Sequence, residues 1–130
     1  MIMKKILAFM AIMIAVVVQA KAQATFVLSD GRIEVDGIRH ENNHIYRYYQ
    51  ATTEYAQFLD EKMNIKERYQ ILSKADIENN VATWLIKGGL IRIDFNNWNI
   101  CIYDGILDKI KVYVWIDKDK TRQYDKEHSN

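Results

Sequence analysis

Residues 90–117 constrain the fold more than any other part of the chain, because apolar and polar side chains alternate along them in three runs. The runs are separated by Asn96-Asn97 and by Asp104-Gly105. Alternation with a period of two places every second side chain on the same face of a strand. Asparagine, aspartate and glycine favour the tight turns that join antiparallel strands. The stretch therefore predicts three antiparallel strands, each with one buried face.

The two faces of this predicted sheet differ in character. The aliphatic face, for which we expect burial, carries Ile91, Ile93, Phe95, Trp98, Ile100, Ile102, Ile110, Val112, Val114 and Ile116. The opposite face carries polar and aromatic side chains, namely Arg92, Asp94, Asn99, Tyr103, Lys111, Tyr113 and Trp115. A sheet that is covered on one side only shows this division.

Residues 1–22 have the pattern of a signal peptide. A basic start precedes an uncharged apolar run at residues 6–18, and small residues follow at cleavage sites after Ala22 or after Ala24. The run is too short to span a bilayer comfortably, and an uncleaved anchor is the alternative. We therefore expect export, to the periplasm or out of the cell, and leave this segment out of the fold prediction.

Charge and cysteine content limit the class of function. The chain has 18 basic and 17 acidic residues, and without residues 1–22 it has 15 basic and 17 acidic ones. This balance gives no electrostatic footprint for nucleic acid, and no later apolar run is long enough to cross a membrane. Cys101 is the single cysteine, so an intramolecular disulfide is excluded. Its place in a strand pattern favours a buried thiol, although its redox state stays open.

The part of the chain before this sheet predicts a hairpin followed by helices. Asp36-Gly37 favours a two-residue hairpin turn, with Ile33, Val35 and Ile38 as candidates for its buried face. From His44 to about Leu72 apolar residues recur every three or four positions, which favours a helix. Residues 45–49 also suit a strand, because tyrosine and isoleucine are good strand formers.

A further helix is predicted between Ser73 and the glycines at 88 and 89. Ser73 with Asp76 three positions later resembles the capping pattern of a helix start, and Gly88-Gly89 would end the helix. Its apolar side would carry Ile77, Val81, Trp84 and Leu85.

These elements together predict an α+β fold: an N-terminal β-hairpin, two to three helices, then a three-stranded antiparallel meander packed on the helices. The layout resembles that of cystatin-like folds, in which a sheet wraps on a helix, and such a likeness of fold carries no function. We expect residues 25–117 to form a single domain and residues 118–130 to form a polar, flexible tail.

One stretch matches a catalytic motif. Residues 40–44 read His-Glu-Asn-Asn-His, the H-E-x-x-H pattern that places two imidazoles on one side of a helix for zinc, with the glutamate as general base. The two central asparagines are poor helix formers, and no later histidine lies where it could be a third ligand. A polar turn is therefore favoured, and a minimal zinc-dependent hydrolase that uses His40, Glu41 and His44 is the alternative.

Other catalytic patterns are missing from the sequence. No serine lies in a nucleophile elbow and no glycine-rich phosphate loop is present, so we expect neither enzymatic activity nor a cofactor. The sequence predicts a non-enzymatic exported binding module of the inhibitor, immunity or adhesion type. Its partner would be a protein or a glycan outside the cytoplasm, held by the polar and aromatic face of the sheet. The candidate contact residues are Arg92, Asp94, Tyr103, Lys111, Tyr113 and Trp115.

A further alternative is a structural envelope protein that assembles with itself by pairing the edge of its sheet. The sequence leaves open the oligomeric state, the identity of any partner and the question of which sheet face is exposed.

Overall fold

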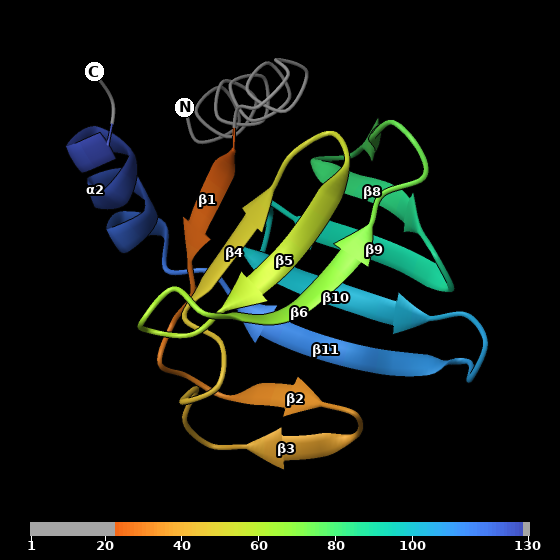
Figure 1. Cartoon of the computed structure of the whole chain (residues 1–130), viewed down its shortest axis with the longest axis horizontal. Helices are drawn as coiled ribbons and strands as arrows, with labels where there is room; N and C mark the ends of the chain where they lie inside the picture. The colour runs from red at the N-terminus through yellow and green to blue at the C-terminus, as the bar shows by residue number, and fades with distance from the viewer. Residues whose placement is uncertain (1–22, 129–130) are drawn as a thin grey trace.

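Residues 23–128, the part of the chain that the computed structural model describes, contain eleven strands and one helix. The smaller sheet contains, in spatial order, β1 (Ala24–Val27), β4 (Tyr48–Ala51), β5 (Tyr55–Leu59) and β6 (Ile65–Gln70). The larger sheet contains, in spatial order, β3 (Ile38–His40), β2 (Ile33–Val35), β11 (Lys109–Trp115), β10 (Asn99–Asp104), β9 (Gly89–Asp94), β8 (Val81–Ile86) and β7 (Asp76–Glu78). The helix α2 spans Lys118–His128. All neighbouring strands are antiparallel (Figure 1).

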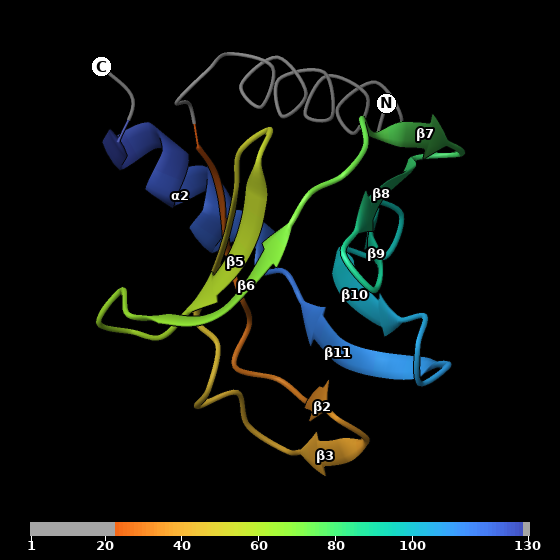
Figure 2. The same cartoon turned by 45° about the vertical axis from the view of Figure 1, so that its right-hand side comes forward.

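The two sheets pack face to face around one core (Figure 2). The smaller sheet supplies aromatic side chains to this core, among them Phe26, Tyr49 and Phe58, each at most 1% exposed. The larger sheet supplies aliphatic ones from every second position of its central strands: Ile91, Ile93, Ile100, Ile102, Val112 and Val114. The rings of Tyr49 and Phe58 meet edge to face at 5.4 Å, and the ring of Phe26 lies 6.1 Å from that of Phe95, in the turn after β9. Burial of these aromatic and aliphatic groups is the main source of stability.

The predicted α+β fold is wrong. The strands predicted within residues 90–117 exist as β9, β10 and β11, but they belong to a seven-stranded sheet rather than a three-stranded meander. A second sheet, and no helix within the described residues, covers their aliphatic face. The helices predicted before them are strands, so the cystatin-like layout is wrong as well.

The predicted hairpin is present, with Asp36 and Gly37 at its turn. Both have positive φ angles, 50° and 82°, as the favoured two-residue turn requires. Of the residues predicted to be buried on it, Ile33 is 2% exposed whereas Ile38 is 62% exposed. The hairpin reaches the core only through β2, because β3 is the edge of the sheet.

The predicted helix between His44 and Leu72 is replaced by β4, β5 and β6. Tyr49 and Ala51 point inward from β4, and Ala56 and Phe58 point inward from β5. Between the two strands the Thr52 hydroxyl accepts hydrogen bonds from the N–H groups that follow it. These inward positions are two residues apart within each strand and five residues apart across the turn, so the predicted helical spacing counted residues of both faces. The alternative of a strand near residues 45–49 was closer, because β4 begins at Tyr48.

The second predicted helix is also wrong, because residues 76–86 form the β7–β8 hairpin. Asn79 and Asn80 have φ angles of 53° and 62°, and asparagine is one of the few residues that adopt this left-handed conformation readily. Alternation on β8 then buries Trp84 and leaves Leu85 55% exposed. Ser73 caps no helix, and its hydroxyl accepts a hydrogen bond from the Leu85 N–H at 2.9 Å.

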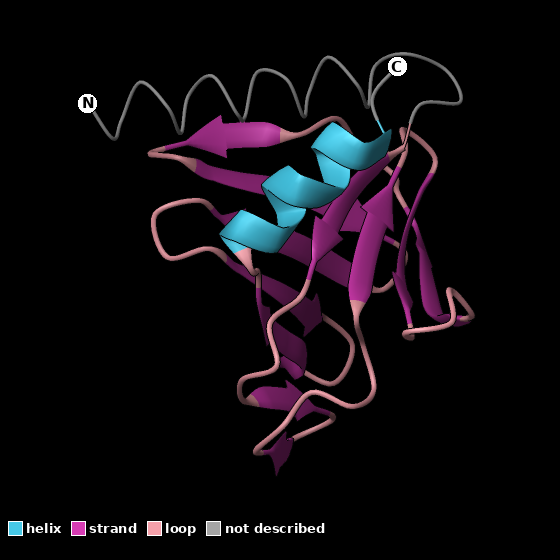
Figure 3. Cartoon of the chain, turned by 90° about the vertical axis from the view of Figure 1, so that its left-hand side faces the viewer, coloured by secondary structure: helices cyan, strands magenta, loops and turns pink. Residues whose placement is uncertain are grey.

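Residues predicted to form a flexible tail instead form α2, which lies beside β1 (Figure 3). Asp117 caps this helix, since its carboxylate accepts a hydrogen bond from the Lys120 N–H at 3.0 Å. Asp119 in the first turn and Lys126 in the last turn suit the helix dipole.

The predicted signal peptide, residues 1–22, lies outside the described residues, so export stays a prediction. Within residues 23–128 no helix is long and apolar enough to cross a membrane.

Gly89 tests the tight pairing of β9 with β10. A Cβ atom at Gly89 would overlap the backbone carbonyl oxygen of Tyr103, so we expect Gly89→Ala to lower the free energy of unfolding by at least about 3 kcal/mol. A Cβ at Gly31 meets only the Ser29 hydroxyl at 3.4 Å, and Gly31→Ala should change stability by less than about 1 kcal/mol. Urea denaturation of both variants measures the difference, and equal effects would contradict this packing.

Candidate functional site

The outer face of the seven-stranded sheet carries three rows of side chains that run across the strands. The middle row consists of Asp76, Thr83, Arg92, Cys101, Tyr113, Glu34 and Arg39, from β7 to β3. A second row consists of Glu78, Val81, Asp94, Asn99 and Trp115. The third consists of Leu85, Leu90, Tyr103 and Ile110. We call this surface the outer face.

Five of the six predicted contact residues lie on the outer face, and Lys111 does not. The register shifts between Ile102 and Tyr103, where the β10–β11 pairing changes from Val112 to Ile110. This bulge breaks the alternation of β11. The Lys111 ammonium lies 5.6 Å from the ring centroid of Tyr69 in the smaller sheet. Ile110, predicted to be buried, is 40% exposed instead.

Tyr113 and Trp115 form a braced aromatic pair. Their rings meet edge to face at 5.4 Å, and the buried Asn99 side chain donates a hydrogen bond to the Tyr113 hydroxyl at 2.9 Å. Burial, together with the nearby Cys101 and Asp94, raises the pKa of Tyr113, while the bond from Asn99 lowers it. Trp115 remains 37% exposed. The ring contact and the hydrogen bond from Asn99 thus fix the arrangement of the pair.

Asp94 has a structural part in the turn after β9. Its carboxylate accepts hydrogen bonds from the N–H groups of Asn96 and Asn97, at 2.8 and 3.3 Å, and from the Asn97 side chain at 3.0 Å. Burial acts to raise the pKa of Asp94, but these hydrogen bonds outweigh it and hold the pKa below its ordinary value. This carboxylate is therefore largely committed to its own turn.

Arg92 and Cys101 lie side by side at the centre of the face. Arg92 is exposed, and Cys101 is half-buried between it and Tyr113. Burial raises the pKa of the Cys101 thiol, the charge of Arg92 lowers it and Glu34 raises it, and the net shift is upward. The thiol is therefore protonated at neutral pH, which is unlike an activated nucleophile.

An apolar corner borders the third row, and the sequence reading missed it. Ile106 and Leu107 in the β10–β11 turn are 81% and 61% exposed, and Leu85 is 55% exposed. A Cβ on Gly88 would lie 3.6 Å from Ile106, so this turn packs against the β8–β9 turn. Leu85 had been assigned to a helix face. The pair Ile106-Leu107, apolar residues between turn formers, was the one available signal.

The solvent side of the smaller sheet differs from the outer face of the larger sheet, because its polar side chains bond to one another. The side chain of Gln50 donates to Thr25, Gln57 donates to Gln50, and Arg68 donates twice to Gln57. Three of these residues, Thr25, Gln50 and Gln57, are at most 7% exposed. This ladder leaves few donors or acceptors for a ligand, so the outer face of the larger sheet is the better candidate.

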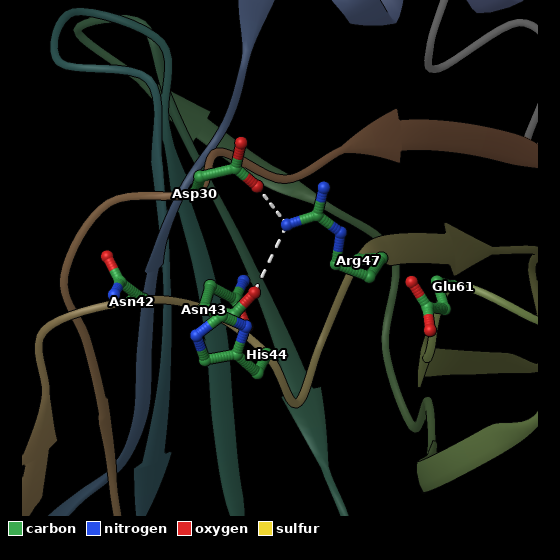
Figure 4. Close-up of a pocket in the computed structure, with 6 residues that line it drawn as sticks. All are labelled: Asp30, Asn42, Asn43, His44, Arg47 and Glu61. Atoms are coloured by element: carbon green, nitrogen blue, oxygen red, sulfur yellow. Dashed lines mark hydrogen bonds and ion pairs between the residues drawn. The ribbon is translucent and has the colours of Figure 1, made fainter.

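The H-E-x-x-H residues lie in a strand and a loop, not in a helix. His40 ends β3, Glu41 follows in a bend, and His44 faces a depression of about 460 Å³ with Asp30, Asn42, Asn43, Arg47 and Glu61 (Figure 4). Within residues 23–128, no group of three or more histidine, cysteine, aspartate or glutamate side chains could hold a metal ion. The helical geometry that the zinc motif requires is not formed.

The depression is a network that orders the loop before β4. Arg47 forms an ion pair with Asp30 and donates to the Asn43 carbonyl oxygen at 3.1 Å. The buried Asn43 side chain accepts hydrogen bonds from the N–H groups of Ile45 and Tyr46, at 3.3 and 2.8 Å. The hydrogen bond and charge of Arg47 hold the pKa of Asp30 below its ordinary value. These side chains are mostly occupied with one another.

Comparison with known proteins gives one partial match. No family model matches the chain, and no solved structure matches it. A stretch of 58 residues is 38% identical to a probable tRNA sulfurtransferase of Malacoplasma penetrans (strain HF-2), covering 44% of this chain and 15% of that protein. The chain thus spans a small part of this relative's length. The match relates a segment of this chain to a segment of a protein named as an enzyme.

Asp94 makes acid stability a test of the turn after β9. Because its pKa is depressed on folding, its contribution to stability is present above its unfolded value of 3.8 and is lost as the pH falls through the folded value. We expect the stability difference between wild type and Asp94→Asn to shrink from pH 6 to pH 2, measured by melting temperature. Asn97→Ala removes one donor and should move the acid transition to higher pH. A constant difference would contradict the assignment.

Proposed function

We propose that this protein is a non-enzymatic binding module, of the inhibitor, immunity or adhesion type, that captures a protein partner on the outer face. One observation carries the proposal. Exposed aromatic, aliphatic and cationic side chains, among them Trp115, Leu85 and Arg92, lie on the same face of the paired strands β8 to β11. Aromatic residues and arginine are the types that contribute most binding energy in protein interfaces.

The apolar corner favours a protein over a glycan as the partner. Sugars stack on aromatic rings, whereas exposed leucine and isoleucine side chains gain most when another apolar surface removes them from water. Leu85, Ile106 and Leu107 are each more than half exposed. Seven strands spaced by about 4.8 Å give a face roughly 30 Å wide. That width suits an interface that buries about 800 Å² on each partner.

Site-specific photo-crosslinking tests the proposal. A photoreactive residue at position 85, in the full chain expressed in cells of its source, should give one discrete protein adduct. Arg92→Glu in the same chain should reduce this adduct at least about tenfold, because the charge at the centre of the face is reversed. The matched control is a photoreactive residue at Ile65, which is 50% exposed on the other sheet.

The outcomes separate the partner classes. Equal adducts at positions 85 and 65, or none at 85, would contradict the proposal. Saturable binding to a glycan array that Trp115→Ala abolishes would replace the protein partner by a sugar. The double variant Tyr113→Ala/Trp115→Ala is a less specific test of binding than Arg92→Glu, because it also removes the hydrogen-bond partner of buried Asn99.

The partial likeness motivates a second candidate, contact with tRNA. The relative's name refers to tRNA, while residues 23–130 carry 15 basic and 17 acidic residues, which is a weak basis for binding a polyanion. Fluorescence anisotropy with a tRNA pool should show no saturable binding at 50 mM salt if the binding-module proposal holds. Saturable binding that weakens steeply between about 50 and 200 mM salt would favour the second candidate.

A further inference from the structure

The four edge strands of the two sheets are protected in different ways. Charged side chains lie on three of them: Arg39 on β3, Lys66, Glu67 and Arg68 on β6, and Asp76 and Glu78 on β7. Such charges discourage pairing with another strand. The fourth edge, β1, reads Ala-Thr-Phe-Val and carries no charge. It is also the edge beside which α2 lies.

The helix satisfies the backbone groups that a further strand would bond. The Val27 N–H donates a hydrogen bond to the Thr121 hydroxyl at 2.9 Å, and this hydroxyl donates to the Val27 carbonyl oxygen at 3.4 Å. The Asp117 N–H donates to the same carbonyl oxygen at 2.8 Å. Thr121 is fully buried at this contact. The Thr121 hydroxyl and the Asp117 N–H thus occupy the place of a neighbouring strand on β1.

The helix α2 buries little of its side-chain surface in this position. Thr121 is its only buried side chain, and the ring of Tyr124 lies 6.0 Å from that of Tyr48. The Lys118 ammonium lies 5.2 Å from the ring centroid of Trp98. An isolated helix of 11 residues is marginally stable in water. Elements with little buried apolar area open at low free-energy cost.

We infer that the β1 edge is a strand-pairing surface for a second copy of this chain, and that α2 is the gate that covers it. When α2 lifts, the Val27 N–H loses its acceptor, and Thr25 presents its N–H and C=O two residues away on the same side. The Val27 C=O keeps its hydrogen bond from the Asp117 N–H, which precedes the helix. Two β1 strands then pair antiparallel across a two-fold axis. The uncharged edge favours a second copy, because self-pairing brings no like charges together, as it would on β6.

The test opens the gate without truncating the chain. Thr121→Val keeps the size of the side chain and removes the hydroxyl, so hydrogen exchange at the Val27 amide should accelerate about tenfold. Light scattering should then show a dimer at concentrations at which the wild type is monomeric. Adding Val27→Lys to Thr121→Val should restore the monomer, because it places a charge on the exposed edge.

Thr52→Val is the matched control. The Thr52 hydroxyl also accepts backbone hydrogen bonds and is 7% exposed, but it lies in the β4–β5 turn. The Thr52→Val variant should leave both the hydrogen exchange of the Val27 amide and the oligomeric state unchanged. Tyr124→Ala, which loosens α2 without touching β1, should act as Thr121→Val does and serves if that variant does not fold. A monomer with unchanged Val27 exchange, or a dimer that Val27→Lys leaves intact, would overturn the inference.

Discussion

The packing of an aromatic layer against an aliphatic layer is the interaction on which the rest of the structure depends. Phe26, Tyr49 and Phe58 of the smaller sheet fill the space above the isoleucines and valines of β9, β10 and β11. Because side chains alternate along a strand, the choice of inward residues also fixes the outward ones. The composition of the outer face is therefore a consequence of the core, except at the bulge in β11, where the alternation is interrupted.

The sequence predicted strands correctly where the two-residue alternation of side chains and the turn-forming residues lie within a few positions of each other. The strands of residues 90–117 and the Asp36-Gly37 hairpin were predictable, because each signal lies within a few residues. The strands β4 to β8 were not predictable, because apolar residues of both faces, counted across the turns, recur every three or four positions as in a helix. In addition, Asn79-Asn80 forms a turn that glycine marks more often. The pairing of β2 with β11 joins residues far apart in sequence, and no local pattern encodes it.

Alternation along the strands also decides which of the candidate contact residues share a face. Five contact residues were placed on one face by alternation alone, which the strands obey. Lys111 was misplaced because the bulge that turns it leaves no mark in the sequence pattern. Asp94 lies on the outer face, but its carboxylate engages its own turn. The apolar corner was missed because Leu85 had been read as part of a helix, so the aliphatic character of the surface emerged only from the sheet order.

The faces and the edges of these sheets can each promote aggregation, and different residues protect them. An exposed apolar face next to an open edge would favour aggregation. Here the backbone of Leu85 is already bonded, since its N–H donates to the Ser73 hydroxyl and its carbonyl oxygen accepts from the Leu72 N–H. Asp76 and Glu78 place charges on the β7 edge, which pairs with the other end of β8. The uncharged edge, β1, belongs to the other sheet and lies under α2. The two proposed contacts thus use different sheets, so partner capture on the outer face and self-pairing at β1 can occur independently.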